Sequence, residues 1–211
     1  MSINLYQIHI QTTEKIKVEK MLVHYLEQQT NERSVMVQLG EKTSINFFTH
    51  EIPTMFAVSI QHEGWVTILH DSYDHLNELT KMLSNYFNTM VIHALGQSTV
   101  DNYYLSVYQK GILLRLISYD DLKVEIEQKG SPFSFEKLPI GKNIGTETEP
   151  TYVFDYDVMH SFCLHFQIDL LNEVTELNEQ CMIIRYERAN PSPTNRRPTL
   201  ISRLFNIIKL K

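Results

Sequence analysis

The chain has 211 residues, of which 43% are hydrophobic, 21% are charged and only seven each are Gly and Pro. These values are ordinary for a globular protein and exclude collagen-like or low-complexity sequence, and the length predicts one large domain with at most a short appendage. The net charge of −6 is unevenly divided, because residues 1–189 carry 14 basic and 25 acidic side chains, a net −11, whereas residues 190–211 carry +5 and no acid. An acidic body repels a phosphate backbone, so we expect no nucleic-acid partner.

Hydrophobic alternation predicts strands, and apolar spacing of three and four residues predicts helices. In the first half of the chain the expected elements are strands over residues 3–10, 34–39, 44–50, 55–61 and 65–70, and helices over 13–29 and 73–87. The last two of these strands predict a hairpin, because their turn ends on Gly64, where a positive φ is favoured.

The second half predicts further strands and a third helix. The expected strands cover residues 89–95, 103–108, 112–118 and 182–186. Strands 103–108 and 112–118 predict a second hairpin, because their turn ends on Gly111. Either Asp155 or Asp157 caps the third helix. Residues 119–152 contain several Gly and Pro residues and predict a long surface excursion with one short strand at most.

The order of these elements predicts the fold class. Several connections are tight hairpins and helices do not alternate strictly with strands, so we expect an α+β fold: a mostly antiparallel sheet with two to three helices packed on one face. We assign residues 1–189 to a single domain, residues 190–198 to a linker and residues 199–211 to a basic amphipathic C-terminal helix.

Cysteine usage and hydropathy predict a location. No stretch approaches the ~18 apolar residues of a membrane span, and the N-terminus lacks a basic region followed by an apolar one. Cys163 and Cys181 stand in neither a CxxC nor a CxxH spacing. These features favour a cytoplasmic protein with two reduced thiols.

The densest polar cluster lies at residues 70–78. Its ligand-type side chains are His70, Asp71, Asp74, His75 and Glu78. Carboxylates and imidazoles on one helical face suit Zn²⁺ or Mn²⁺, with His93 or His165 as a distant ligand, and would make the chain a small metal-assisted hydrolase. We favour helix capping instead, with Asp71 or Ser72 as the N-cap.

Other candidate sites are weaker. Cys163 lies on the apolar stripe of its predicted helix, and His160 and His165 diverge by roughly 140° around the helix axis. Residues 141–146, GKNIGT, have the glycines of an anion nest but not the order of a phosphate-binding loop. Because no GxSxG, HExxH, GxGxxG or EF-hand pattern is present, we predict no catalytic residue, cofactor or metal.

Aromatic side chains on the predicted strands have two interpretations. They are Phe47, Phe48, Trp65, Tyr103, Tyr104 and Tyr108. Exposed aromatics on a sheet can stack on bases, but no Arg or Lys interleaves with these and the body is acidic. We therefore assign them to the core.

The C-terminal segment is basic and amphipathic. Leu200, Ile201, Leu204, Phe205 and Ile208 share one face, and Ser202, Arg203, Asn206 and Lys209 share the other. A helix of this length is unstable alone, so it must pack on the body or a sister subunit, enter a partner's groove, or lie on an anionic membrane. The predicted partner-binding residues are Arg203, Leu204, Phe205, Ile208 and Lys209.

Three stretches resemble small bacterial proteins of unassigned role, some of them thought to be toxin-immunity proteins. They are Trp65-Val66-Thr67, the helix with Leu79 to Ser84, and Tyr103-Tyr104-Leu105 through Gly111. The resemblance implies neutralisation of a partner and no catalytic motif. With the acidic body it predicts a non-catalytic intracellular binding or regulatory protein that engages a basic protein partner. The alternatives are the metal-assisted hydrolase and a peripheral membrane protein anchored by the C-terminal helix.

Overall fold

A computed structural model of the chain describes residues 4–29, 35–41, 50–120, 126–171 and 180–186. The fold is α+β, as the sequence predicts. In chain order the elements are β1 (Asn4–Gln11), α1 (Lys15–Gln29), β2 (Val35–Glu41), β3 (Met55–His62), β4 (Trp65–His70), α2 (Asn77–Tyr86), β5 (Met90–Gln97), β6 (Asn102–Gln109), β7 (Ile112–Asp120), β8 (Glu127–Lys129), β9 (Lys142–Asn143), β10 (Tyr152–Val153), α3 (Tyr156–Leu164) and β11 (Gln180–Tyr186).

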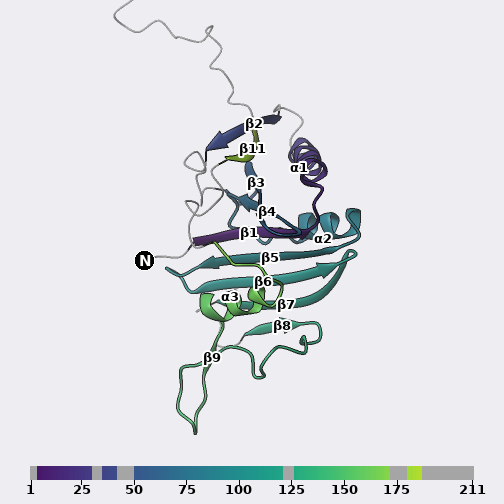
Figure 1. Ribbon diagram of the computed structural model, residues 1–211. Coiled ribbons are helices and arrows are strands. Elements are labelled where there is room, and N and C mark those ends of the chain that lie inside the picture. The colour runs from purple at the N-terminus through teal and green to yellow at the C-terminus, as the bar shows by residue number, and fades with distance from the viewer. Residues whose placement is uncertain (1–3, 30–34, 42–49, 121–125, 172–179, 187–211) are drawn as a thin grey trace, which may run out of the picture.

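One long sheet forms the frame of the molecule (Figure 1). Its strand order is β2-β11-β3-β4-β1-β5-β6-β7-β8, and each described pair in it is antiparallel. The predicted hairpins form: β3–β4 turns at Gly64 and β6–β7 at Gly111, with φ of 78° and 76°. Glycine adopts these angles without the steric cost of a Cβ.

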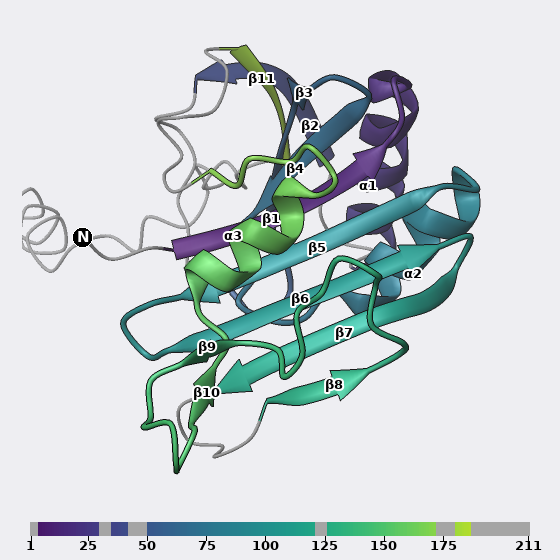
Figure 2. The same cartoon turned by 60° about the horizontal axis from the view of Figure 1, so that its bottom comes forward.

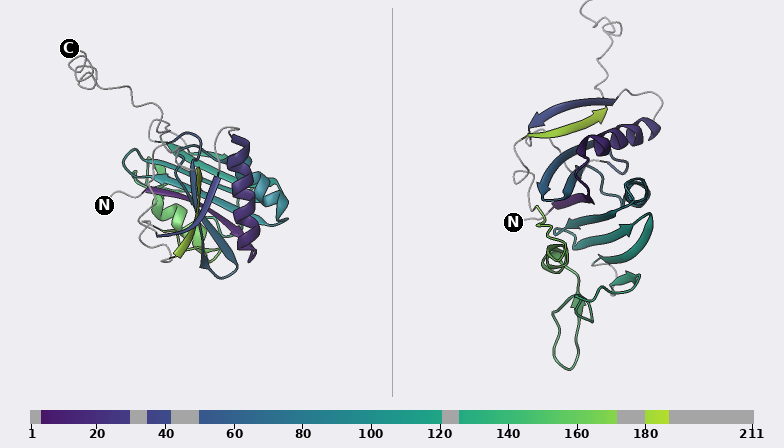
Figure 3. Two further views of the ribbon diagram at one scale, coloured as in Figure 1. Left: turned by 90° about the horizontal axis from the view of Figure 1, so that it is seen from above. Right: turned by 45° about the vertical axis from the view of Figure 1, so that its right-hand side comes forward.

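Helices cover both faces of the sheet, so the expectation of a single covered face is wrong (Figures 2 and 3). On one face α1 packs on β2, β3 and β11, and α2 packs on β1, β5, β6 and β7. On the other face α3 packs on β6 through Met159, Phe162 and Cys163. Side chains alternate between the faces along each strand: Ile8 and Ile10 contact the α1–α2 layer, whereas Ile92 and Leu105 belong to the α3 layer.

The predicted aromatic core is confirmed where the structure describes it. Trp65, Tyr103, Tyr104 and Tyr108 are all buried. Phe47 and Phe48 lie outside the described residues, as do most of the strand predicted over residues 44–50 and the whole C-terminal helix predicted over residues 199–211.

The predicted excursion over residues 119–152 contains more structure than expected. Strand β8 extends the main sheet, and β9 and β10 form a separate two-stranded hairpin. Ile126, Phe133, Phe135 and Ile140 pack against the α3 layer of the core. The expectation of one short strand at most is therefore wrong, because apolar side chains spaced along this Gly- and Pro-containing segment bind it to the sheet.

Arg115 on β7 anchors residues 128–136 to the sheet. Its guanidinium donates to both carboxylate oxygens of Glu136, at 3.0 Å from Nε and 2.7 Å from Nη2, and to Gln128 Oε1 at 2.6 Å. The side chains of Arg115 and Glu136 are each only 1% exposed. Glu136 also accepts the backbone N–H of Phe133 at 2.8 Å. A charge this deeply buried requires a partner, so the ion pair sets the path of residues 128–136 over the sheet.

Candidate functional site

The cluster at residues 70–78 does not form the site that its composition suggests. Asp71 and Ser72 are buried in a loop that precedes α2, and the N-cap of α2 is Leu76, with no side chain capping it. Capping by Asp71 or Ser72 is therefore a wrong prediction. The helix begins later than the sequence indicates, because both side chains bind another segment of the chain.

The carboxylate of Asp71 holds the start of β3. It accepts hydrogen bonds from the backbone N–H of Thr54 at 2.8 Å, the hydroxyl of Thr54 at 2.6 Å and the backbone N–H of Met55 at 3.2 Å. Ser72 donates to the backbone carbonyl of Glu51. These bonds replace the helix amides that the sequence assigns to the two residues, and they give the cluster a structural role.

Replacing Asp71 by Asn is expected to lower the free energy of unfolding by about 1.5–3 kcal/mol, the range for a buried hydrogen bond to a charged group. Asp74 is exposed, and among the described residues its carboxylate accepts a hydrogen bond only from the backbone N–H of His75. Asp74→Asn should therefore cost much less. Urea denaturation of both variants measures the difference, and equal losses would contradict this assignment of Asp71.

His70 on β4 and His93 on β5 contact each other in the protein interior, although 22 residues separate them in the sequence. Their Nε2 atoms lie 3.2 Å apart, so one ring donates to the other, and both side chains are buried. Tyr6 packs edge-on to His70, and Tyr104 packs edge-on to His93. Desolvation lowers the pKa of His70 to about 3 and holds the pKa of His93 well below its ordinary value, where the neighbouring imidazoles add to the effect.

This aromatic row continues to the surface. His75 stacks on Tyr104 with ring centroids 3.8 Å apart, and the hydroxyl of Tyr104 donates to Asn77 Oδ1 at 2.5 Å. Burial raises the pKa of Tyr104 to about 12. The row joins the start of α2 to the sheet through stacked and edge-on ring contacts, which favours packing over acid–base chemistry.

The predicted ligand set for a metal-assisted hydrolase is not assembled. His93 contacts His70 but Asp71 is committed to β3, and His165 lies on the α3 face, stacked on Phe135 at 4.1 Å. Within the described parts of the chain, no group of three or more His, Cys, Asp or Glu residues is arranged to hold a metal ion.

The side chains around Cys163 also separate. Cys163 is fully buried in the core, as predicted, and burial raises the pKa of its thiol far above the ordinary value. His160 turns the other way and its Nε2 lies 2.7 Å from Asp169 Oδ1. His160 and His165 therefore point to different surroundings, as their spacing predicts.

The sequence also contains a charge imbalance that the candidate sites above do not include. Residues 143–184 contain eight acidic side chains and no Lys or Arg, and five of the acids lie at positions that the structure describes. Four of these acids follow one another through the β9–β10 hairpin into the start of α3, and we call them the acidic projection: Glu147, Glu149, Asp155 and Asp157. The hairpin extends beyond the rest of the described molecule (Figure 1).

Local hydrogen bonds hold the acidic projection in one shape. The backbone N–H of Ile144 donates to Thr151 O at 2.8 Å, and that of Thr146 donates to Glu149 O at 3.1 Å. Asn143 Oδ1 accepts from the N–H groups of Gly145 and Thr151. These amides are therefore not free to bind an anion, which favours a loop over the alternative of an anion nest at residues 141–146.

Asp155 caps α3, which confirms the predicted cap. Its carboxylate accepts the backbone N–H of Val158 at 3.0 Å. Glu147, Glu149 and Asp157 are exposed instead. The exposed carboxylates are thus attached to a hydrogen-bonded backbone, and their charge faces solvent.

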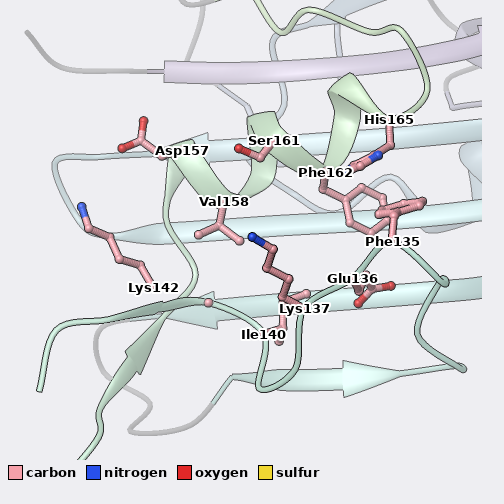
Figure 4. Close-up of a pocket in the computed structure, with 11 residues that line it drawn as sticks. Phe135, Glu136, Lys137, Ile140, Lys142, Asp157, Val158, Ser161, Phe162 and His165 are labelled. Carbon is pink, nitrogen blue, oxygen red and sulfur yellow. The ribbon is translucent and has the colours of Figure 1, made fainter. Parts of the chain in front are cut away.

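A cavity of about 490 Å³ lies beside this projection, between residues 135–142 and α3 (Figure 4). Phe135, Ile140, Val158 and Phe162 give it apolar walls. Its polar lining consists of Glu136, Lys137, Lys142, Asp157, Ser161 and His165. The sequence analysis considered His165 and residues 141–146 separately, but it did not predict the cavity, because its walls come from segments that only the fold brings together.

The predicted partner-binding residues lie outside the described part of the chain, so Arg203, Leu204, Phe205, Ile208 and Lys209 stay a prediction. Among the residues that the structure describes, no helix has the length and apolar character needed to cross a bilayer. Comparison of the chain with protein families, curated proteins and solved structures found no match.

Proposed function

We propose that this protein is a non-catalytic binding protein whose acidic body engages a basic protein partner, and that the acidic projection makes the first contact. The observation that carries the proposal is that the protruding β9–β10 hairpin exposes Glu147 and Glu149, followed by exposed Asp157 at the start of α3, with no Lys or Arg between residues 143 and 171. Charge concentrated on a protruding element steers an oppositely charged partner toward it and raises the association rate.

The construction of the projection supports recognition. Its backbone hydrogen bonds hold Glu147 and Glu149 at an exposed tip, so little ordering entropy is lost when a partner binds. Toxin neutralisation is the form of binding that the resemblance of residues 65–67, 79–84 and 103–111 implies. Two free, buried cysteines suit the cytoplasmic location that belongs to this proposal.

The basic C-terminal segment belongs to the same proposal. Charge complementarity favours its packing on the acidic body or on a sister subunit over insertion in a membrane surface. Truncation after residue 189 followed by liposome flotation separates these possibilities: flotation that requires residues 190–211 would favour the peripheral membrane alternative.

Reversing charge at the tip tests the proposal. Proteins retained from an extract of the source cells by the immobilised wild-type chain are identified, and each basic one is purified. Its association rate with the wild type and with Glu147→Lys/Glu149→Lys is then measured at 50 and 300 mM salt. We expect the rate with the wild type to fall steeply with salt, and the variant to associate at least tenfold more slowly at low salt, since like charges now face each other.

Glu27→Lys/Glu63→Lys is the matched control, because it makes the same change in net charge at exposed positions on α1 and the β3–β4 turn. The control should associate nearly as fast as the wild type. Equal slowing in both variants, salt-independent association, or no basic protein among those retained would each overturn the proposal.

A further inference from the structure

The cavity beside α3 has the size and walls of a small-molecule site. Its volume of about 490 Å³ falls within the usual range for ligand pockets, roughly 300–1,000 Å³. Phe135 stands at one side, with its ring parallel to that of His165 within 15° and edge-on to Phe162. Phe135 also lies parallel to Phe133 and edge-on to Phe166, so a packed cluster of rings forms one aromatic wall of the cavity.

The charges around the cavity select the ligand's sign. Glu136 lines the cavity, but its carboxylate is neutralised by Arg115. Lys142 and Asp157 also line the cavity, and their opposite formal charges add to zero without forming an ion pair. Lys137 is the remaining charged residue of the lining. Its side chain reaches across the opening toward α3 (Figure 4). No ion pair or hydrogen bond joins its ammonium to a described side chain.

One hydroxyl complements this cation. Ser161 lines the cavity from α3, on the side toward which Lys137 extends (Figure 4). An ammonium and a hydroxyl together donate hydrogen bonds to a carboxylate or sulfonate. The cavity therefore combines apolar walls with an ammonium that has no ion-pair partner among the described side chains.

We propose that this cavity binds a small aromatic anion, such as an aryl carboxylate or sulfonate. The ring of the ligand lies against Phe135 and Phe162, and its anionic group binds the ammonium of Lys137 and the hydroxyl of Ser161. This site does not depend on the proposed protein partner, because Glu147 and Glu149 take no part in it.

Fluorescence titration with 1-anilinonaphthalene-8-sulfonate tests the proposal, with the neutral N-phenyl-1-naphthylamine as a second probe. We expect the sulfonate to bind with one site per chain, and Lys137→Gln to weaken its binding about tenfold, equivalent to about 1.4 kcal/mol. The neutral probe should bind Lys137→Gln and the wild type equally. Lys20→Gln, an exposed lysine on α1, is the matched control and should leave both affinities unchanged.

Three results would overturn the proposal. They are no saturable binding of the sulfonate by the folded wild type, equal affinity of the sulfonate for wild type and Lys137→Gln, and equal weakening of both probes by Lys137→Gln. The last result would show that the substitution changes the shape of the cavity and that its charge is not recognised.

Discussion

The free energy of unfolding is expected to fall steeply as the pH decreases from 6.5 to 5, because three imidazoles are buried in their neutral form. His9, His70 and His93 are each at most 1% exposed. Burial lowers the pKa of His9 and of His70 to about 3 from the ordinary 6.5, and lowers that of His93 in the same direction. The folded chain therefore binds fewer protons than the unfolded chain throughout this pH range.

The free energy of unfolding decreases toward acid because the pKa values are lower in the folded state than in the unfolded state. The stabilisation is complete above pH 6.5, where both states hold neutral imidazoles, and it is lost as the pH falls toward the folded pKa. Each group contributes about 0.7 kcal/mol per pH unit at pH 6.5 and approaches about 1.4 near pH 5, so three together approach about 4 kcal/mol per unit. A domain of ordinary stability, about 5–15 kcal/mol, would approach its unfolding midpoint in mild acid.

Urea denaturation between pH 5 and 7.5 measures this slope, in a range where ordinary carboxylates do not titrate. The variant His70→Gln/His93→Gln should keep only about a third of the slope, since His9 remains. If that variant does not fold, the C2–H resonances of the wild type provide a second test. Those of the three buried imidazoles should not titrate between pH 5.5 and 8. Titration of all of them near pH 6.5 would contradict the account.

Replacing Arg115 by Ala is expected to lower the free energy of unfolding by about 3–5 kcal/mol, the usual cost of leaving one member of a buried ion pair alone. The carboxylate of Glu136 would stay buried without its cation, and Gln128 Oε1 would lose its donor. The 128–136 segment should then separate from the sheet, which limited proteolysis would detect as new cleavage within residues 126–140.

Two further variants separate charge burial from a general loss of contacts. Arg115→Met/Glu136→Gln removes both charges while Gln keeps an acceptor for the N–H of Phe133, so it should cost less than Arg115→Ala alone. Lys129→Ala breaks the exposed pair with Glu127 and should change stability by about 1 kcal/mol or less. A loss as large in Lys129→Ala as in Arg115→Ala would contradict the assignment of Arg115.

Local sequence was sufficient to predict most strands of the main sheet. Strand alternation and the glycines at 64 and 111 predict the hairpins of the sheet, and Asp155 predicts the start of α3, because these signals act between neighbouring residues. The face that each helix covers depends on contacts between distant segments. The apolar stripe of α3 carries no sign of which side of the sheet it meets, so the prediction of one covered face was wrong.

The site was predictable only in part for the same reason. Asp71 looks like a helix cap in sequence because its partners, Thr54 and Met55, lie on another segment. The contact of His70 with His93 and the burial of Arg115 by Glu136 are also long-range. The charge imbalance of residues 143–184 could have been read from the sequence directly, but its position on a protruding hairpin required the fold.

Hydrogen–deuterium exchange of the protein, free and bound to a basic partner retained from the cell extract, tests most directly whether the acidic projection is the binding surface. We expect the partner to slow exchange in residues 143–157, at the tip of the β9–β10 hairpin and the start of α3. Protection confined to other segments, such as the loop at residues 71–76, with exchange at 143–157 unchanged, would contradict it.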